Sequence, residues 1–165
     1  MTLSRSSLLC SLVFAAALLL STALRLWLGA RQIRHVQTHR DRVPEAFAGV
    51  IDLQAHRKAA DYTSARQRVG LWHALFSAAV LLGWTLFGGL QLLARANTSL
   101  FGDGLLAQLL LLGEFGLIGA LIELPWELWS TFRLEARFGF NRSTPGLFFA
   151  DQARGLLLGA LVMAP

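Results

Sequence analysis

Four long apolar stretches alternate with polar segments along the chain: residues 7–28, 69–94, 105–129, and a last stretch that begins near residue 147. A helix needs about 20 apolar residues to cross a ~30 Å hydrocarbon core. The first three stretches are long enough to do so. The pattern therefore predicts an all-α, integral-membrane helical bundle with three complete transmembrane helices and the start of a fourth.

The last stretch, residues 147–165, contains Asp151 and Arg154, and only residues 155–165 remain after them. That remainder is about half of a membrane span. We therefore expect a truncated fourth transmembrane helix in a chain that is the amino-terminal fragment of a longer protein. A short re-entrant or core helix is the alternative. On this prediction residues 1–165 form one N-terminal transmembrane domain.

The polar segment between the first two spans, residues 29–68, is expected to contain a helix. Pro44 suits the first position of a helix, and apolar residues recur after it at steps of three and four. They are Phe47, Val50, Ile51, Ala55, Ala59, Tyr62, Ala65 and Val69. This spacing predicts an amphipathic helix that runs directly into the second span.

Composition supports a membrane protein and one orientation. The chain is 55% hydrophobic with a mean hydropathy of +0.51, and 15% of its residues are charged, against roughly 25% in soluble domains. Segment 29–68 carries eight basic and four acidic residues. Because the net charge of +5 is concentrated there, it indicates membrane topology rather than nucleic-acid binding.

The charge bias places loop 29–68 in the cytoplasm and the N-terminus outside. A cleaved signal peptide would put that loop on the wrong side. Residues 95–104 would then be external, and the arginine-bearing loop after residue 129 would be cytoplasmic. Of the 15 basic residues, 14 are arginine. Heavy use of arginine is typical of a GC-rich genome, and we therefore expect a bacterial inner membrane.

Acidic residues inside the third span are candidates for function. Glu114 lies mid-span, where a carboxylate is costly and faces a bundle interior or a polar cavity. It either lines a polar chamber, with His73 as a candidate partner, or forms a structural hydrogen bond between helices. Glu123 and Glu127 flank Pro125; no nearby nucleophile or histidine completes an acid–base site, so interface anchoring is favoured over catalysis.

His35 and His39 have the four-residue spacing of the two ligands in the HExxH zinc motif. Val36 occupies the position of the glutamate that activates water, and a third protein ligand is lacking. Flanking arginines also disfavour a bound dication. We interpret the two histidines as structural or surface residues, and we predict neither catalytic nor metal-ligating residues in this chain. The lone Cys10 indicates no disulfide framework.

Two stretches carry a family resemblance: "AHRKAADYTSARQRVG" (residues 55–70) and "ELPWELWSTFRLEARFGFNRSTPGLFFADQARG" (residues 123–155). Together with "TLFGGLQLL" they resemble the amino-terminal membrane domain of the type I CAAX prenyl endopeptidases, which are integral-membrane zinc metalloproteases. The resemblance covers nearly all of the chain after Arg31. Its most distinctive part is the run Phe138-Gly139-Phe140-Asn141.

The resemblance implies a zinc-dependent endopeptidase whose HExxH motif and third zinc ligand lie carboxy-terminal to these residues. This chain would supply the chamber wall and contacts to substrate, to membrane lipid and to its own C-terminal protease domain, and would be inactive alone. The substrate would be a peptide or a prenylated protein. Candidate substrate-chamber or domain-contact residues are His56, Asp61, Tyr62, Glu114, Glu135, Phe140 and Asn141.

Two other functions remain open from the sequence. One is a non-catalytic membrane scaffold that binds a partner. The other is a transporter or channel subunit using Glu114, which lacks the charged pathway residues expected in other spans.

Overall fold

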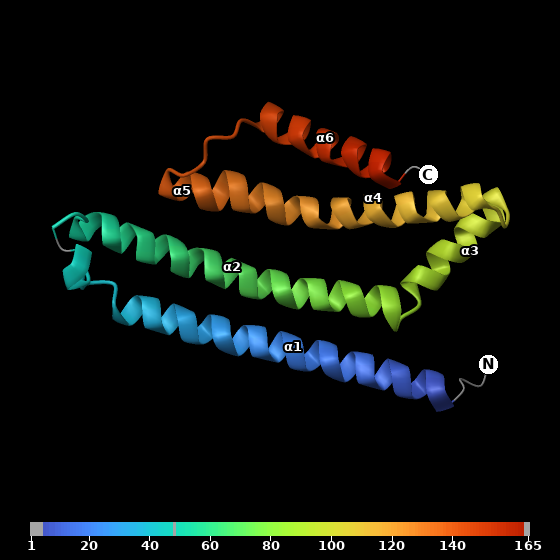
Figure 1. Cartoon of the computed structure of the whole chain (residues 1–165), viewed down its shortest axis with the longest axis horizontal. Helices are drawn as coiled ribbons and strands as arrows, with labels where there is room; N and C mark the ends of the chain where they lie inside the picture. Colours follow the sequence, from blue (N-terminus) through green and yellow to red (C-terminus); the bar gives the residue numbers. More distant parts are fainter. Residues whose placement is uncertain (1–4, 48, 164–165) are drawn as a thin grey trace. The chain divides into compact units, whose positions relative to one another are not determined.

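The computed structural model describes residues 5–47 and 49–163, and these residues form helices joined by short turns, with no strand among them (Figure 1). The chain divides into two compact units, Met1–Leu92 and Leu93–Pro165. The all-helical prediction is confirmed. In chain order the elements are α1 (Arg5–Thr38), η1 (Glu45–Phe47), α2 (Leu53–Thr85), α3 (Gly89–Phe101), α4 (Leu105–Trp129), η2 (Ser130–Glu135), α5 (Ala136–Phe138) and α6 (Pro145–Met163).

The first unit is built on the antiparallel hairpin of α1 and α2, which lie side by side (Figure 1). A close approach occurs at Gly29, where a Cβ atom would lie only 2.5 Å from Cδ2 of Leu71. Gly29 is buried, so its missing side chain lets the two helices pack closely. Small residues at helix contacts are a common way to bring membrane helices together.

The predicted start of the amphipathic helix at Pro44 is wrong. The Phe47 N–H donates to the Pro44 carbonyl at 2.9 Å, which closes only the short 3-10 turn η1. Helix α2 begins instead at Leu53, because the Asp52 carboxylate caps it by accepting the Gln54 N–H at 3.0 Å. From Leu53 the helix runs without a break into the second apolar stretch, as predicted.

The second apolar stretch, residues 69–94, is helical on both sides of a break, and whether the two helices form one broken span stays a prediction. Helix α2 ends at Thr85, and Gly88 adopts a left-handed conformation with φ +80°. A Cβ atom on Gly89 would lie 2.9 Å from the Gly83 carbonyl oxygen. Two consecutive glycines therefore permit a break that hydropathy does not register. The helix resumes as α3, bent by 51° from α2, and most of the expected external loop 95–104 is helical.

In the second unit, α4 has the bounds predicted for the third span, and the helix continues through Pro125. It extends through the π-helical η2 into α5 and ends at Gly139. Helix α6 then begins at Pro145, two residues before the predicted start near residue 147. Phe132 of η2 and Phe148 of α6 make an edge-to-face ring contact with centroids 5.6 Å apart.

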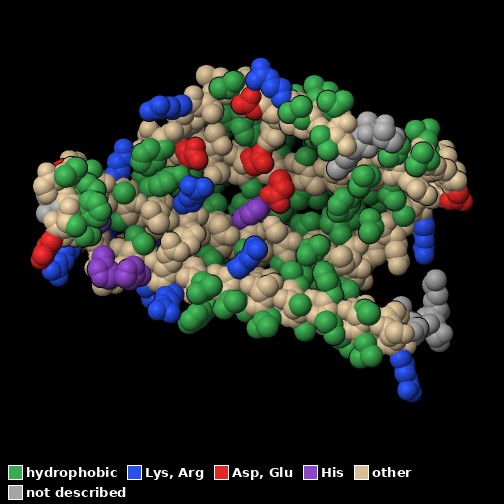
Figure 2. All heavy atoms as spheres, viewed as in Figure 1, with side chains coloured by type: hydrophobic (Ala, Val, Ile, Leu, Met, Phe, Trp, Pro, Cys, Tyr) green, Lys and Arg blue, Asp and Glu red, His purple; other side chains and the backbone are tan. Residues whose placement is uncertain are grey.

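Few side chains of this membrane protein are buried. The buried hydrophobic residues found are Ala60, Ala107 and Leu134, and Figure 2 shows hydrophobic side chains along the outside of the helices in that view. Within the part of the chain that the structure describes, two helical segments, Arg5–Thr38 and Leu105–Phe138, are long and apolar enough to cross a membrane, or up to three if the bent α2–α3 pair counts as one. The total of three complete spans and a fourth start stays a prediction.

Candidate functional site

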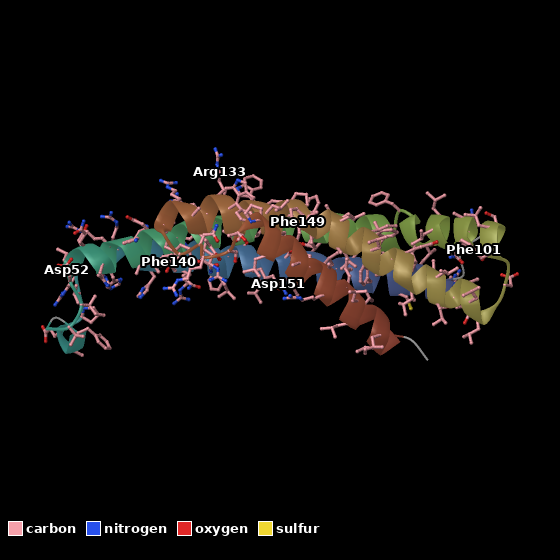
Figure 3. All side chains as sticks on the ribbon, turned by 90° about the horizontal axis from the view of Figure 1, so that it is seen from above. Asp52, Phe101, Arg133, Phe140, Phe149 and Asp151 are labelled. Atoms are coloured by element: carbon pink, nitrogen blue, oxygen red, sulfur yellow. The ribbon has the colours of Figure 1, made fainter. Side chains whose placement is uncertain are left out.

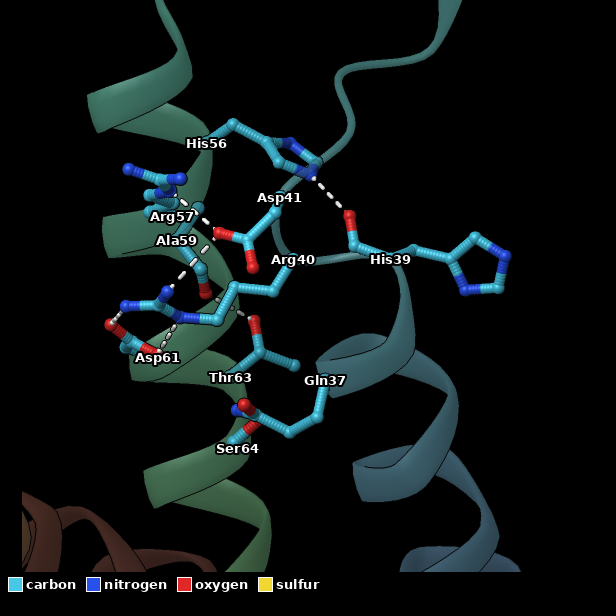
Figure 4. A network of polar contacts seen from close by, with 10 residues as sticks. All are labelled: Gln37, His39, Arg40, Asp41, His56, Arg57, Ala59, Asp61, Thr63 and Ser64. Carbon is cyan, nitrogen blue, oxygen red and sulfur yellow. Dashed lines mark hydrogen bonds and ion pairs between the residues drawn. The ribbon is translucent and has the colours of Figure 1, made fainter.

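A group of polar side chains joins α1 to α2 near the turn of the hairpin (Figure 4). Gln37 of α1 donates through Nε2 to Ser64 Oγ of α2 at 2.7 Å, and Ser64 is only 3% exposed. Arg40, two residues past α1, donates through Nε and Nη2 to the two carboxylate oxygens of Asp61 at 2.7 and 2.8 Å. We call Gln37, Arg40, Asp61 and Ser64 the hairpin clamp.

The electrostatics of the clamp keep its arginine charged. The hydrogen bonds that Arg40 donates to Asp61 raise the pKa of Arg40 above its ordinary value, with smaller contributions from the charges of Asp61 and Asp41, while desolvation acts in the opposite direction. The two-pronged geometry matches the fork of guanidinium donors to both carboxylate oxygens. Asp61 is therefore engaged on both oxygens by a partner that stays protonated.

Further contacts extend the clamp along the turn. Asp41 accepts from Arg57 Nε at 2.7 Å, and His56 Nε2 lies 3.1 Å from the His39 carbonyl oxygen. The predicted contact residues His56 and Asp61 thus both hold α2 against the end of α1. Tyr62, the next residue after Asp61, is half-buried.

The resemblance implies zinc, and His35 and His39 are the residues to test for it. Their ring centroids are 4.4 Å apart, and Nδ1 of His39 lies 2.8 Å from the His35 carbonyl oxygen. Within residues 5–47 and 49–163, no group of three His, Cys, Asp or Glu side chains is placed to hold a metal. Since catalytic zinc takes three protein ligands, these two histidines do not fit the ion.

The mid-span carboxylate Glu114 has a partner on the neighbouring helix. Asn97 of α3 donates through Nδ2 to Glu114 Oε2 at 3.3 Å, and Asn97 is 3% exposed. This contact is the interhelical hydrogen bond that the sequence left open as one reading of Glu114. His73 lies in the other unit, where its Nε2 is 3.5 Å from Ser77 Oγ; a His73–Glu114 contact stays a prediction.

The run Phe138-Gly139-Phe140-Asn141 ends one helix with a defined backbone motif. Gly139 is left-handed, with φ 73° and ψ 22°, and its N–H donates to the Ala136 carbonyl at 3.1 Å. The Phe140 N–H donates to the Glu135 carbonyl at 2.9 Å. This pair of bonds is the Schellman arrangement, which needs a residue that tolerates positive φ. Phe140 follows it, as labelled in Figure 3. Its side chain is 48% exposed.

The residues after Phe140 start the next helix. Asn141 Oδ1 accepts the Ser143 N–H at 2.7 Å, a side-chain turn typical of asparagine. Thr144 then caps α6 by accepting the Leu147 N–H through Oγ1 at 3.3 Å, and Pro145 takes the first helical position, where its missing N–H costs nothing. The segment 139–144 is therefore a short, internally bonded link.

Glu127, close to Pro125 in sequence, pairs with a residue of α6. Glu127 of α4 accepts a hydrogen bond from the Gln152 amide of α6. The sequence did not reveal the partners of Asp61, Glu114 and Glu127, which are Arg40, Asn97 and Gln152. Asn97 was missed because residues 95–104 were interpreted as a loop, and the other two because their pairing depends on how the helices align.

The candidate residues fall into two groups. His56, Asp61 and Tyr62 belong to the first unit, and Glu114, Glu135, Phe140 and Asn141 to the second. The structure brings together His56 and Asp61 around the hairpin turn, and Glu135 and Phe140 through their backbones. Whether any of them contacts a substrate or a protease domain stays a prediction.

Comparison with known proteins gives consistent results. A family model described as "CAAX prenyl protease N-terminal, five membrane helices" matches residues 32–165. The Caenorhabditis elegans CAAX prenyl protease 1 homolog is 30% identical over 157 residues, which cover 94% of this chain and 35% of the relative. The Homo sapiens CAAX prenyl protease 1 homolog is 29% identical over 163 residues, which cover 93% of this chain and 34% of that relative.

A solved structure supports the same fold. The crystal structure of S. mikatae Ste24p matches with a TM-score of 0.83 at 21% sequence identity, over 92% of this chain and 36% of that one. The chain thus spans about a third of the length of the curated relatives it matches.

Proposed function

The chain belongs to the CAAX prenyl protease N-terminal family, and from this premise we propose that it forms the amino-terminal membrane part of a zinc-dependent endopeptidase. The observation that carries the proposal is the family match over residues 32–165. The cleavage chemistry and the zinc ion are assigned to parts of the protease outside these 165 residues. The substrate is assigned to the class of prenylated proteins or peptides, by analogy with the names of the relatives.

In this proposal the residues of this chain position the substrate and form part of the chamber wall, and they do not cleave the substrate. The hairpin clamp fixes α1 against α2 and so holds one part of a chamber wall in place. Because both carboxylate oxygens of Asp61 are bonded to Arg40, we assign Asp61 to this positioning role. The half-buried Tyr62 beside it is the better candidate for a substrate contact.

The second unit contributes a polar pair and a rigid link. Asn97 near the end of α3 and Glu114 within α4 place an amide and a carboxylate against each other, and an acidic group inside a span marks a polar interior. The bonded link 139–144 presents Phe140 as a large exposed aromatic side chain, which suits a contact with the protease domain. Asn141 and Glu135 maintain the backbone of that link.

The proposed orientation follows the charge bias. Loop 29–68, with its excess of basic residues, lies in the cytoplasm and the N-terminus lies outside, in a bacterial inner membrane. This places the hairpin clamp at the cytoplasmic surface.

The test is a cleavage assay with two proteins. The product of the complete reading frame that encodes these residues is purified and reconstituted in vesicles, and so is the 165-residue chain. Both are incubated with a farnesylated peptide ending in a CAAX sequence. The complete protein is expected to cleave the peptide, to lose activity with a zinc chelator and to regain it with added zinc, and the 165-residue chain is expected to be inactive. A complete protein that never cleaves, or that cleaves in the presence of chelator, would show that the chain is a scaffold or part of another enzyme.

A further inference from the structure

A groove of about 190 Å³ lies between α1 and α2, on the side of Gly29 away from the hairpin turn. It exists because the facing side chains are small where the helices pass each other. The volume is below the roughly 300–1,000 Å³ of pockets that enclose a small-molecule ligand, so it suits a narrow chain rather than a compact molecule. Between its two leucines the groove is lined by Ser21, Thr22 and Arg25 of α1 and by Ala74, Ser77 and Ala78 of α2.

The groove has a charged end and an apolar end. The antiparallel register pairs Gly29 with Leu71 and Gln32 with Gln67, so Arg25 occupies the end nearer the hairpin turn. Leu18 and Leu81 line the opposite end. The seven steps from residue 18 to residue 25 rise about 10 Å along the helix axis. A ligand lying along the groove therefore meets a cation at one end and hydrocarbon at the other.

Arg25 supplies a positive charge that the described residues leave uncompensated. It takes part in none of the hydrogen bonds, ion pairs or ring contacts found among residues 5–47 and 49–163. By contrast Arg31, further along α1, lies over the Trp27 ring with its guanidinium carbon 5.7 Å from the centroid. The hydroxyls of Ser21 and Thr22 donate to the Leu18 carbonyl, so Arg25 is the main donor in the groove.

The depth of Arg25 matches the phosphate level of a bilayer. Residues 7–24 are free of charge and span about 27 Å as a helix, close to the ~30 Å hydrocarbon core. Arg25 therefore lies at the edge of the hydrocarbon, where an arginine reaches toward lipid head groups. Guanidinium groups bind phosphate through two parallel N–H bonds.

We propose that this groove is a binding site for an anionic phospholipid. The lipid phosphate pairs with the Arg25 guanidinium, and one acyl chain lies along the groove past Ser77 and Ala78 toward Leu18 and Leu81. Among the described residues, none in the most apolar part of α1 is buried, so its surface is available to lipid. The site is independent of the proposed protease function, because it needs neither zinc nor a peptide substrate.

The test measures lipid retention by the full-length protein in detergent, by native mass spectrometry. Dioleoyl phosphatidylglycerol, dioleoyl phosphatidylcholine and inorganic phosphate are added in separate titrations. Wild-type protein is expected to retain the anionic lipid preferentially and to ignore phosphate alone. Arg25→Gln is expected to weaken retention of phosphatidylglycerol about fivefold, the effect of one arginine near a membrane surface.

Two matched variants distinguish lipid binding in this groove from the loss of a positive charge elsewhere on α1 and from misfolding. Arg31→Gln removes a basic residue from the same helix but outside the groove, and it is expected to leave lipid retention unchanged. Ala78→Leu fills the groove and keeps Arg25, so it is expected to weaken retention even if Arg25→Gln does not fold. The proposal is overturned if Arg31→Gln weakens retention as much as Arg25→Gln, if Ala78→Leu has no effect, or if inorganic phosphate binds as well as the lipid.

Discussion

Gly139 provides the sharpest test of how the family-specific run is built. Its backbone lies at φ 73° and ψ 22°, a conformation that costs an L-residue roughly 1–2 kcal/mol. Two hydrogen bonds depend on it, from the Gly139 and Phe140 N–H groups to the Ala136 and Glu135 carbonyls. Gly139→Ala is therefore expected to destabilise the protein by about 1–2 kcal/mol, and Gly139→Asn by less, because asparagine tolerates this region.

The matched control is Gly146→Ala, seven residues further on. Gly146 lies in the first turn of α6, and a Cβ atom there would meet nothing within 4 Å. Alanine at that position is expected to be neutral or to stabilise the helix by a few tenths of a kcal/mol. Both variants add one methyl group to a glycine. They differ in the backbone conformation of that glycine, which is left-handed at position 139 and helical at position 146.

The assay is thermal unfolding in detergent, followed by far-ultraviolet circular dichroism. For a chain of this size about 1–2 kcal/mol corresponds to a fall in melting temperature of roughly 2–8 °C. If Gly139→Ala and Gly146→Ala melt at the same temperature, the left-handed turn does not hold the two helices and the reasoning about this run is wrong.

Three further predictions concern the other contacts. In a double-mutant cycle by reversible detergent unfolding, Asn97→Ala and Glu114→Ala should show a coupling of about 0.6 kcal/mol, typical of interhelical hydrogen bonds in membranes; purely additive effects would exclude the bond. Arg40→Asp and Asp61→Arg should each lower the melting temperature and the double exchange should recover it. Because the pKa of Arg40 is raised, its contribution to folding stability is fully present below its ordinary pKa and is lost only as the pH rises above that value. The stability contributed by the Arg40–Asp61 pair should therefore stay constant from about pH 6 to about pH 9. Gly88→Ala should destabilise the break after α2 by about 1–2 kcal/mol, and an unchanged melting temperature would mean that its φ of +80° is not required.

Hydropathy located the helices well where the pattern was uninterrupted. The third stretch, residues 105–129, coincides with α4 because leucines fill it from the Gly104 N-cap onward. The same method missed the break at Gly88, since glycine is nearly neutral on a hydropathy scale while its effect is conformational. The polar run around Asn97 was interpreted as a loop, although backbone hydrogen bonding, not side-chain polarity, decides whether a segment near the membrane is helical.

The role of a residue in its own turn was easier to predict from the sequence than its side-chain contacts with another helix. Glycine is favoured in tight turns and asparagine in bonds to nearby backbone groups, and Gly139 and Asn141 occupy these positions here. The Arg40–Asp61 pair was not predictable, because it requires the length of the turn and the register of two helices. Charge counting along loop 29–68 used Arg40 only as one basic residue among eight.

We propose that these 165 residues form chamber wall and position the substrate, while the zinc ion and the cleavage chemistry belong to the rest of the protease. Zinc content by inductively coupled plasma mass spectrometry tests it most directly, on the 165-residue chain and on the complete protein purified in the same detergent. The account predicts about one zinc per molecule in the complete protein and none above background in the chain. Stoichiometric zinc in the 165-residue chain, lost on replacing His35 and His39 by alanine, would contradict it.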